Sequence, residues 1–171
     1  MSTTLVFVVA QNDFRDEELL IPRDYLRKNG CTVLVAAPMP QSARGKMGTI
    51  IEPDMTIEQI NLAAIDGLVF VGGPGATIFY DHPTVLQLVR NAKRQGKVLG
   101  AICAASTILA NAGVLISKRA TGFPTEEMSI RDKGGEYTGM PCEVDGLVVT
   151  AKDPSAAYVF AKALHTVTVS T

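Results

Sequence analysis

The chain has 171 residues, 47% of them hydrophobic, and a formal net charge of −1 with acidic and basic residues mixed along its length. This length suits one globular domain spanning residues 1–171, and the charge pattern contains neither a basic stripe for nucleic acid nor a polybasic patch for an anionic membrane surface. No apolar run approaches the length of a membrane span, and the N-terminal run turns polar too early for a signal peptide.

Apolar runs typical of buried strands alternate with amphipathic stretches typical of helices. The first run is continuously apolar, as expected for a strand buried on both faces of a parallel sheet. Strands are expected within residues 4–10, 31–38, 49–54 (a short edge strand), 66–76 and 98–103, with a hairpin of two short strands within 142–154. Helices are expected within residues 16–30, 81–97 and 154–167, and directly after Cys103. Repeated strand–helix units predict an α/β fold with a mostly parallel sheet and helices on both faces.

Three strand ends carry the first functional clue. In parallel α/β sheets, binding and catalytic sites form at the carboxyl ends of the strands. Ala10-Gln11, Gly72-Gly73 and Cys103 all follow an expected strand directly. We therefore expect these three segments to meet at one edge of the sheet.

Cys103 lies where the apolar run Val98–Ile102 meets a helical pattern, and only small residues follow it. A sharp strand-to-helix turn that exposes a nucleophile, known as a nucleophile elbow, requires small neighbours of this kind. The positive end of the following helix is expected to lower the pKa of the thiol and favour the thiolate. The alternative interpretation is a buried structural cysteine at the end of a strand.

Two further segments could serve such a thiol. The turn Gly72-Gly73-Pro74-Gly75 can lend backbone N–H groups to a developing oxyanion, although it could also be a plain turn. Glu18, near the start of the first helix, could place a carboxyl in the same pocket. Asp16 and Glu17 precede it, and all three acids suit the positive end of a helix, so periodicity alone does not identify the inward-facing one.

Four stretches together resemble the ThiJ/PfpI superfamily: FRDEELLIPRDYLRKNG, IDGLVFVGGPGA, GKVLGAICAASTILANAGVL and VDGLVVTAKDP. They occur in the family's order and cover nearly the whole chain. The resemblance implies a flavodoxin-like three-layer α/β/α sandwich with a reactive cysteine, Cys103, at a nucleophile elbow. It also implies that a protonated Glu18 hydrogen-bonds the sulfur, and that the N–H groups of Gly73 and Ala104 form an oxyanion pocket.

The chain departs from the family at the histidine positions. Protease-like members carry a histidine directly after the cysteine, where this chain has Ala104; deglycase-like members carry one in the stretch that here reads TGFP, so that Phe123 occupies the place in the pocket. Asp153 matches a loop near the pocket where glycine is common, and it could bind a polar substrate or cap the final helix.

The remaining histidines and cysteines suggest structural roles. His82 is expected in a helix cap, and His165 lies near the end of the last helix, where a cation complements the helix dipole. Cys31 suits a small core position, and Cys142 has no evident partner. Three cysteines without an export signal predict reduced thiols in a cytoplasmic protein.

The leading hypothesis is a stress-related, glyoxalase- or deglycase-like enzyme that acts on reactive carbonyls such as methylglyoxal. Cys103 would attack the aldehyde, Glu18 would move the proton, and neither a metal nor an organic cofactor would be needed. One alternative is a redox sensor or chaperone in which Cys103 is oxidised. Another is a peptidase or amidase, which the absence of a Cys–His pair disfavours. The resemblance also implies a homo-oligomer, a dimer or larger.

Overall fold

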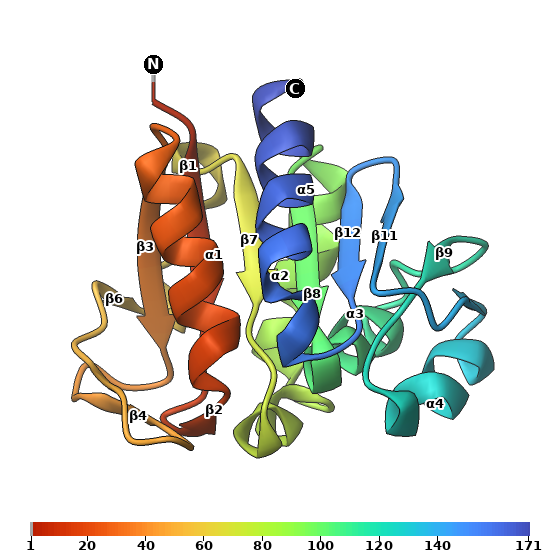
Figure 1. Cartoon of the computed structure of the whole chain (residues 1–171), viewed down its shortest axis with the longest axis horizontal. Helices are drawn as coiled ribbons and strands as arrows, with labels where there is room; N and C mark the ends of the chain where they lie inside the picture. The colour runs from red at the N-terminus through yellow and green to blue at the C-terminus, as the bar shows by residue number, and fades with distance from the viewer. Residues whose placement is uncertain (1) are drawn as a thin grey trace.

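A seven-stranded sheet lies at the centre of the computed structural model, which describes residues 2–171 (Figure 1). Its strands are β1 (Thr4–Val8), β3 (Thr32–Ala37), β6 (Met55–Thr56), β7 (Gly67–Phe70), β8 (Val98–Ile102), β11 (Cys142–Asp145) and β12 (Val148–Ala151). They follow the order β11-β12-β8-β7-β1-β3-β6, and every neighbouring pair is parallel except β11 with β12.

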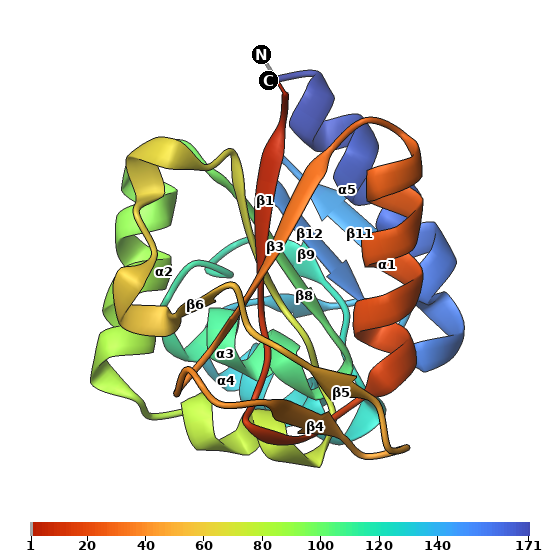
Figure 2. The ribbon, with the colours of Figure 1, turned by 90° about the vertical axis from the view of Figure 1, so that its left-hand side faces the viewer.

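Helices cover both faces of this sheet (Figure 2). Helices α1 (Asp16–Lys28) and α5 (Ala157–Val169) pack on one face, and α2 (Pro83–Arg94) and α3 (Ser106–Asn111) pack on the other. The short helix α4 (Glu127–Asp132) packs against α3. The predicted α/β fold with a flavodoxin-like, mostly parallel sheet is therefore confirmed. None of the helices formed by residues 2–171 is both long and apolar enough to cross a membrane.

The alternation of side chains along β1 explains the two-sided core. Leu5 and Phe7 pack with the residues beneath α1 and α5, whereas Val6 and Val8 pack with those beneath α2 and α3. All four side chains are fully buried. Because successive residues of a strand point to opposite faces, an uninterrupted apolar run is what a doubly covered strand requires.

Two small sheets flank the main one: β2 (Asn12–Phe14), β4 (Ala43–Gly45) and β5 (Ile50–Ile51) form one, and β9 (Arg119–Ala120) and β10 (Glu136–Tyr137) form the other. The short edge strand predicted within residues 49–54 is present as β5, which lies at the edge of the first of these sheets. A turn after β4 folds the chain back, so β5 pairs antiparallel with β4, and β6 takes the edge of the main sheet.

The carboxyl ends of β7 and β8 point to the lower edge of the sheet in Figure 1, where β2 and β4 also lie. The turns that follow these strands are η3 (Pro74–Phe79) and η4 (Cys103–Ala105), and they contact each other. The expected convergence of three strand ends at one edge is thus present.

Candidate active site

Cys103 adopts the strained backbone of a nucleophile elbow. It follows β8 and opens η4 with a φ of 63°, a left-handed conformation that residues with a side chain rarely adopt. The turn leaves no room for bulky neighbours: a Cβ added to Gly72 would lie 2.6 Å from the carbonyl oxygen of Ile102 and 3.0 Å from the Cβ of Cys103. The absence of a side chain at Gly72, on the turn that faces Cys103, therefore has a steric cause.

Glu18 is the acid of α1 that faces Cys103. Its side chain is fully buried, and its Oε2 accepts a hydrogen bond from the N–H of Gly72 at 2.8 Å. Its Oε1 is also buried and has no hydrogen-bond partner within residues 2–171. One carboxyl oxygen is therefore held by the backbone, and the other is available for a proton.

The other two acids of the first turn have separate roles. Asp16 is nearly buried and accepts hydrogen bonds from the N–H groups of Met47 and Thr49 at 2.8 and 2.9 Å, which holds the turn after β4. Glu17 forms an ion pair with Arg15, with 2.5 Å between Oε2 and Nε. Three consecutive acids thus point in three directions, which the helical pattern in the sequence did not resolve.

The carboxyl and the thiol shift each other's proton affinity. Burial raises the pKa of Glu18 to about 8, while its interactions with Cys103, the N–H of Gly72 and Arg15 oppose this increase. Burial also raises the pKa of Cys103 well above its usual value, and Glu18 raises it further. The expected thiolate-favouring effect of the helix is therefore outweighed, since the thiol is 8% exposed and loses its hydration.

Two backbone N–H groups counteract part of this desolvation. The N–H groups of Ala104 and Gly73 bond the sulfur and lower the pKa of Cys103. An oxyanion formed on an atom attached to this sulfur would lie next to the same two donors. The resemblance assigned an oxyanion pocket to these residues, and the structure places both beside Cys103.

Gly73 is required for this arrangement. It has a φ of 100°, and a Cβ built on it would lie 2.5 Å from the backbone nitrogen of Arg15 and 2.6 Å from the carbonyl oxygen of Asp13. Gly30 also has a positive φ, 85°, but no described atom lies within 4 Å of its added Cβ.

We expect Gly73→Ala to lower the free energy of unfolding by about 3 kcal/mol or more, because backbone strain and a backbone clash add together. The matched control Gly30→Ala should cost only about 1 kcal/mol, since it brings strain without a clash. Urea denaturation of both variants checks this. Equal losses would contradict the close approach at Gly73.

The sulfur opens into a cavity of about 410 Å³ at the lower edge of the sheet. A volume of this size is in the range of small-molecule sites. The lining residues come from segments on both sides of Cys103: Arg15, Lys46, Gly73, Pro74, Thr77, Tyr80, Cys103, Ala104, Phe123, Thr125, Glu126 and Pro154.

Tyr80 and Glu126 form a polar pair in this cavity that the sequence analysis missed. The hydroxyl of Tyr80 lies 2.6 Å from Oε1 of Glu126 and 2.9 Å from the carbonyl oxygen of Ala104. The hydroxyl of Thr107 also donates to Oε1 of Glu126, at 3.0 Å. Burial, followed by the adjacent Glu126, raises the pKa of Tyr80. The sequence did offer one indication that Glu126 lies in the pocket: it follows Phe123 by three residues, and Phe123 was already assigned to the pocket.

Comparison with known proteins agrees with this geometry. The family model for DJ-1/PfpI matches residues 4–166, which is most of the sequence. The chain belongs to the DJ-1/PfpI family. Its α/β fold is thus the fold of that family.

Several DJ-1/PfpI relatives cover most of the chain. MJ0967 of Methanocaldococcus jannaschii is 34% identical, over 91% of this chain and 78% of its own length. Deglycase PH1704 of Pyrococcus horikoshii is 28% identical (91% and 93%), and glutathione-independent glyoxalase DJR-1.2 of Caenorhabditis elegans is 26% identical (91% and 83%). A ThiJ/PfpI domain protein from Brachyspira murdochii has a solved structure with a TM-score of 0.97 and 25% identity, covering 100% of this chain and 99% of the other.

The histidines of this DJ-1/PfpI protein lie away from the cavity. His82 is the N-cap residue of α2, where its Nδ1 accepts the N–H of Val85 at 3.4 Å, which confirms the predicted cap. The ring of His165 packs at 6.2 Å from the ring of Tyr25. Neither residue lines the cavity around Cys103. Within residues 2–171, the chain therefore contains no Cys–His pair at this site.

The structure separates the two remaining predicted site residues of this DJ-1/PfpI chain. Phe123 lines the cavity with a side chain that is 40% exposed. Asp153 does not line it; Pro154 does, and Asp153 accepts a hydrogen bond from the hydroxyl of Ser155. Asp153 occupies the N-cap position of η6 (Pro154–Ala156), although its side chain makes no capping hydrogen bond to the described backbone.

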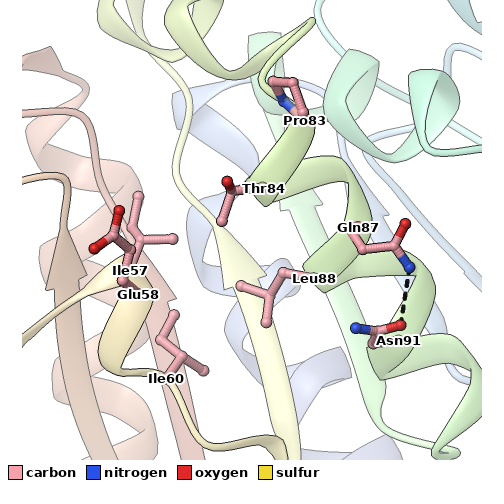
Figure 3. Close-up of a pocket in the computed structure, with 8 residues that line it drawn as sticks. All are labelled: Ile57, Glu58, Ile60, Pro83, Thr84, Gln87, Leu88 and Asn91. Atoms are coloured by element: carbon pink, nitrogen blue, oxygen red, sulfur yellow. Dashed lines mark hydrogen bonds between the residues drawn. The ribbon is translucent and has the colours of Figure 1, made fainter.

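A second hollow, of about 530 Å³, lies between the segment of Ile57 to Ile60 and α2 (Figure 3). Gln87 and Asn91 on its wall bond each other, and Glu58 is the only ionisable side chain among the described residues that line it. That wall offers neither a thiol nor a proton-transfer pair, so the cavity at Cys103 is the candidate active site. Within residues 2–171, no group of three His, Cys, Asp or Glu side chains is placed to hold a metal ion.

Proposed function

We propose that the protein is a cofactor-independent enzyme of the glyoxalase or deglycase type, which uses Cys103 to attack reactive carbonyl compounds. The observation that carries this proposal is the buried Glu18 carboxyl beside the thiol, with Oε2 held by the N–H of Gly72 and Oε1 without a partner in residues 2–171. The names of relatives from C. elegans and P. horikoshii, a glyoxalase and a deglycase, support it.

The raised pKa values of Glu18 and Cys103 determine which of the two groups loses its proton first. The coupled pair of Glu18 and Cys103 loses its first proton near pH 8, because the pKa of Glu18 is raised to about 8 and that of Cys103 lies higher. The resulting anion has a carboxylate facing a thiol. Glu18 can then accept the thiol proton while the sulfur attacks, which makes it a general base.

For a 2-oxoaldehyde, the sulfur bonds to the aldehyde carbon, and the N–H groups of Gly73 and Ala104 stabilise the oxygen that becomes negative. Glu18 returns its proton to this oxygen, and a neutral hemithioacetal results. The Glu18 carboxylate then removes the hydrogen of the former aldehyde carbon and delivers a proton to the neighbouring carbonyl carbon, while the proton of the hemithioacetal hydroxyl moves to the neighbouring carbonyl oxygen. Water hydrolyses the thioester that this leaves, and methylglyoxal plus water becomes lactate without any external oxidant.

The test is turnover of methylglyoxal by purified protein without added cofactor, followed by chromatographic detection of lactate. We expect kcat/KM to rise with pH toward about 8, since the pair must lose one proton before the attack. Absence of lactate at high enzyme concentration, with Cys103 shown to be reduced, would reject the glyoxalase reaction. Reversible oxidation of Cys103 by peroxide in such a preparation would favour the redox-sensor alternative instead.

We expect Tyr80→Phe to lower kcat by about 10- to 100-fold, because a hydroxyl group beside the Ala104 carbonyl supports the oxyanion turn and can relay a proton. The matched control is Tyr158→Phe on the exposed face of α5, which should retain full activity. Steady-state kinetics of both variants gives the comparison. An effect confined to stability, with kcat unchanged, would assign Tyr80 a structural role only.

We further propose that the protein is cytoplasmic and assembles with itself into a dimer or a larger ring, as the resemblance to the family implies. Light scattering coupled to gel filtration measures this directly. A mass equal to one chain, 18.2 kDa, across the working concentration range would reject self-association.

A further inference from the structure

One wall of the Cys103 cavity carries positive charge. Arg15, between β2 and α1, and Lys46, in the turn after β4, both line the cavity. Glu126 lines it from the segment just before α4. In Figure 1, β2 and β4 lie at the left of the lower edge of the sheet and α4 lies at the right, with the end of β8 between them.

Neither cation is paired with a residue of the cavity wall. Arg15 forms its ion pair with Glu17 through Nε, and its terminal N–H groups have no ion-pair partner within residues 2–171. Lys46 forms no ion pair within the same residues. Among the described residues of the cavity wall, Glu126 is the only carboxylate.

Glu126 is already occupied by hydroxyl groups. Its Oε1 accepts bonds from Tyr80 and Thr107, and its Oε2 accepts one from Thr125 at 2.5 Å. These contacts hold the carboxyl on the side of η3 and α3. A second anion could therefore be bound by Arg15 and Lys46 without displacing any contact of Glu126.

The position of Lys46 is built into the fold. Asp16, 3% exposed, holds the N–H groups of Met47 and Thr49, and a Cβ added to Gly45 would lie 2.5 Å from Oδ2 of Asp16. The N–H of Lys46 itself donates to the carbonyl of Phe14 at 2.9 Å. Burying a carboxylate is costly unless hydrogen bonds compensate it, and here both oxygens serve to fix this turn.

Arg15 acts within electrostatic range of the reacting groups. Arg15 lines the same cavity as Cys103, and its charge opposes the burial that raises the pKa of Glu18. Its backbone is also fixed, because its N–H donates to the carbonyl of Gly72 at 2.9 Å. The guanidinium therefore belongs to the neighbourhood of the nucleophile, and not to a remote surface.

The volume of the cavity points to a substrate larger than a three-carbon aldehyde. About 410 Å³ equals roughly 14 water molecules at about 30 Å³ each. A molecule with a carbonyl at Cys103 and a charged group several bonds away would use this space. Guanidinium and ammonium groups bind carboxylates through strong charge-assisted hydrogen bonds.

We propose that the substrates of this site are 2-oxoaldehydes that carry a carboxylate, with Arg15 and Lys46 binding the carboxylate while Cys103 attacks the aldehyde carbon. This substrate class rests on the carbonyl chemistry of the proposed function. A suitable probe is 4,5-dioxopentanoate, which differs from methylglyoxal by an added CH₂COO⁻ group on its terminal carbon.

The reaction of this probe balances without a further reactant except water. The sulfur bonds to C5, and the thiol proton ends on the C5 oxygen. The C5 hydrogen then moves as a proton to C4 with shift of the electron pair, and the proton on the C5 oxygen moves to the C4 oxygen. C5 is thereby oxidised to a thioester carbon and C4 is reduced to an alcohol carbon. Hydrolysis breaks the S–C5 bond, releases 2-hydroxyglutarate and restores the thiol.

The first experiment compares kcat/KM for 4,5-dioxopentanoate and for methylglyoxal. We expect the wild type to prefer the carboxylated probe by about tenfold or more. Lys46→Met and Arg15→Gln should each reduce the ratio of the two kcat/KM values several-fold, whereas Lys46→Arg should retain it. Raising the salt concentration should also reduce the ratio, because salt screens the attraction between the cations and the carboxylate. The control Lys93→Met, on α2, should leave the ratio unchanged. A wild-type ratio near one, or a ratio unaffected by both substitutions, would overturn the proposal.

The second experiment needs no turnover, so it separates the carboxylate site from the proposed function. Iodoacetate and iodoacetamide both alkylate a thiol: an S–C bond forms, iodide leaves and the thiol proton goes to solvent. Mass spectrometry gives the two rates at Cys103. We expect the iodoacetate-to-iodoacetamide ratio to exceed the ratio for the urea-unfolded chain and to fall in Lys46→Met. If the ratio is raised but no aldehyde is turned over, the carboxylate site stands and the carbonyl chemistry fails; an unchanged ratio rejects the site.

Discussion

Replacing Cys103 with alanine lowers kcat/KM for methylglyoxal by about 10³-fold or more, because no other thiol lines the cavity within residues 2–171. Alanine retains the Cβ and therefore the strain of the positive φ. The free energy of unfolding should consequently change by less than about 1 kcal/mol. Kinetics and urea denaturation on the same preparation measure both quantities.

The glycine variant separates activity from strain. Cys103→Gly also lacks the nucleophile, but a glycine adopts a φ of 63° without steric cost. We expect Cys103→Gly to be inactive and at least as stable as Cys103→Ala. Glycine relieves backbone strain of about 1 kcal/mol in the folded state, and this gain offsets the conformational entropy that glycine adds to the unfolded chain. Residual activity in both variants would assign the chemistry to another group.

Replacing Glu18 with glutamine lowers kcat/KM by about 10²- to 10⁴-fold, the range typical of a lost general acid–base group. Glutamine has the same shape, and its side-chain oxygen can still accept the N–H of Gly72. The loss should therefore appear without unfolding. The control is Glu58→Gln, a substitution at an exposed acid on the wall of the second hollow.

Glu18 also makes stability depend on pH. Its pKa is raised from an ordinary value of 4.5 to about 8 in the fold, so the folded state retains a proton that the unfolded state has lost. Its contribution to stability is fully present below pH 4.5 and is lost progressively as the pH rises to about 8. The shift sets an upper limit of about 5 kcal/mol on this loss.

Urea denaturation between about pH 4.5 and about pH 9 tests the sign of this dependence. The comparison is best made in the Cys103→Ala background, because the thiol titrates together with the carboxyl. With Glu18 present, stability should fall across this window. The Glu18→Gln substitution removes the titrating group, so its stability curve should be flatter, and higher near pH 8. Parallel curves for the two proteins would show that the carboxyl is not desolvated.

The sequence predicted those features that depend on local pattern. The strand before Cys103, the small residues after it and the glycines that follow β7 are contiguous in the chain, and each is explained by one turn of backbone. The hairpin at Asp145-Gly146 was predictable for the same reason, and β11 and β12 form it. The continuous apolar run also identified β1 correctly, since its neighbours on both faces are apolar.

Features that depend on distant residues were not predictable. Tyr80 and Glu126 are 46 positions apart, and only the fold brings the hydroxyl to the carboxyl. The proton affinity of Cys103 was predicted in the wrong direction, because a helix end is visible in the sequence whereas the depth of burial is not. The same limit explains β5, whose partner is set by a turn held from α1.

The N-cap residue and first turn of α1 give four consecutive side chains four different tasks. Arg15 faces the cavity, Asp16 holds the turn that carries Lys46, Glu17 orients Arg15, and Glu18 faces the sulfur. The Arg15 cation and the Glu18 carboxyl are therefore carried by one continuous segment, the N-cap and first turn of α1. A displacement of α1 along its axis would move these groups together, so changes in β2 would alter their approach to Cys103 while preserving their mutual spacing.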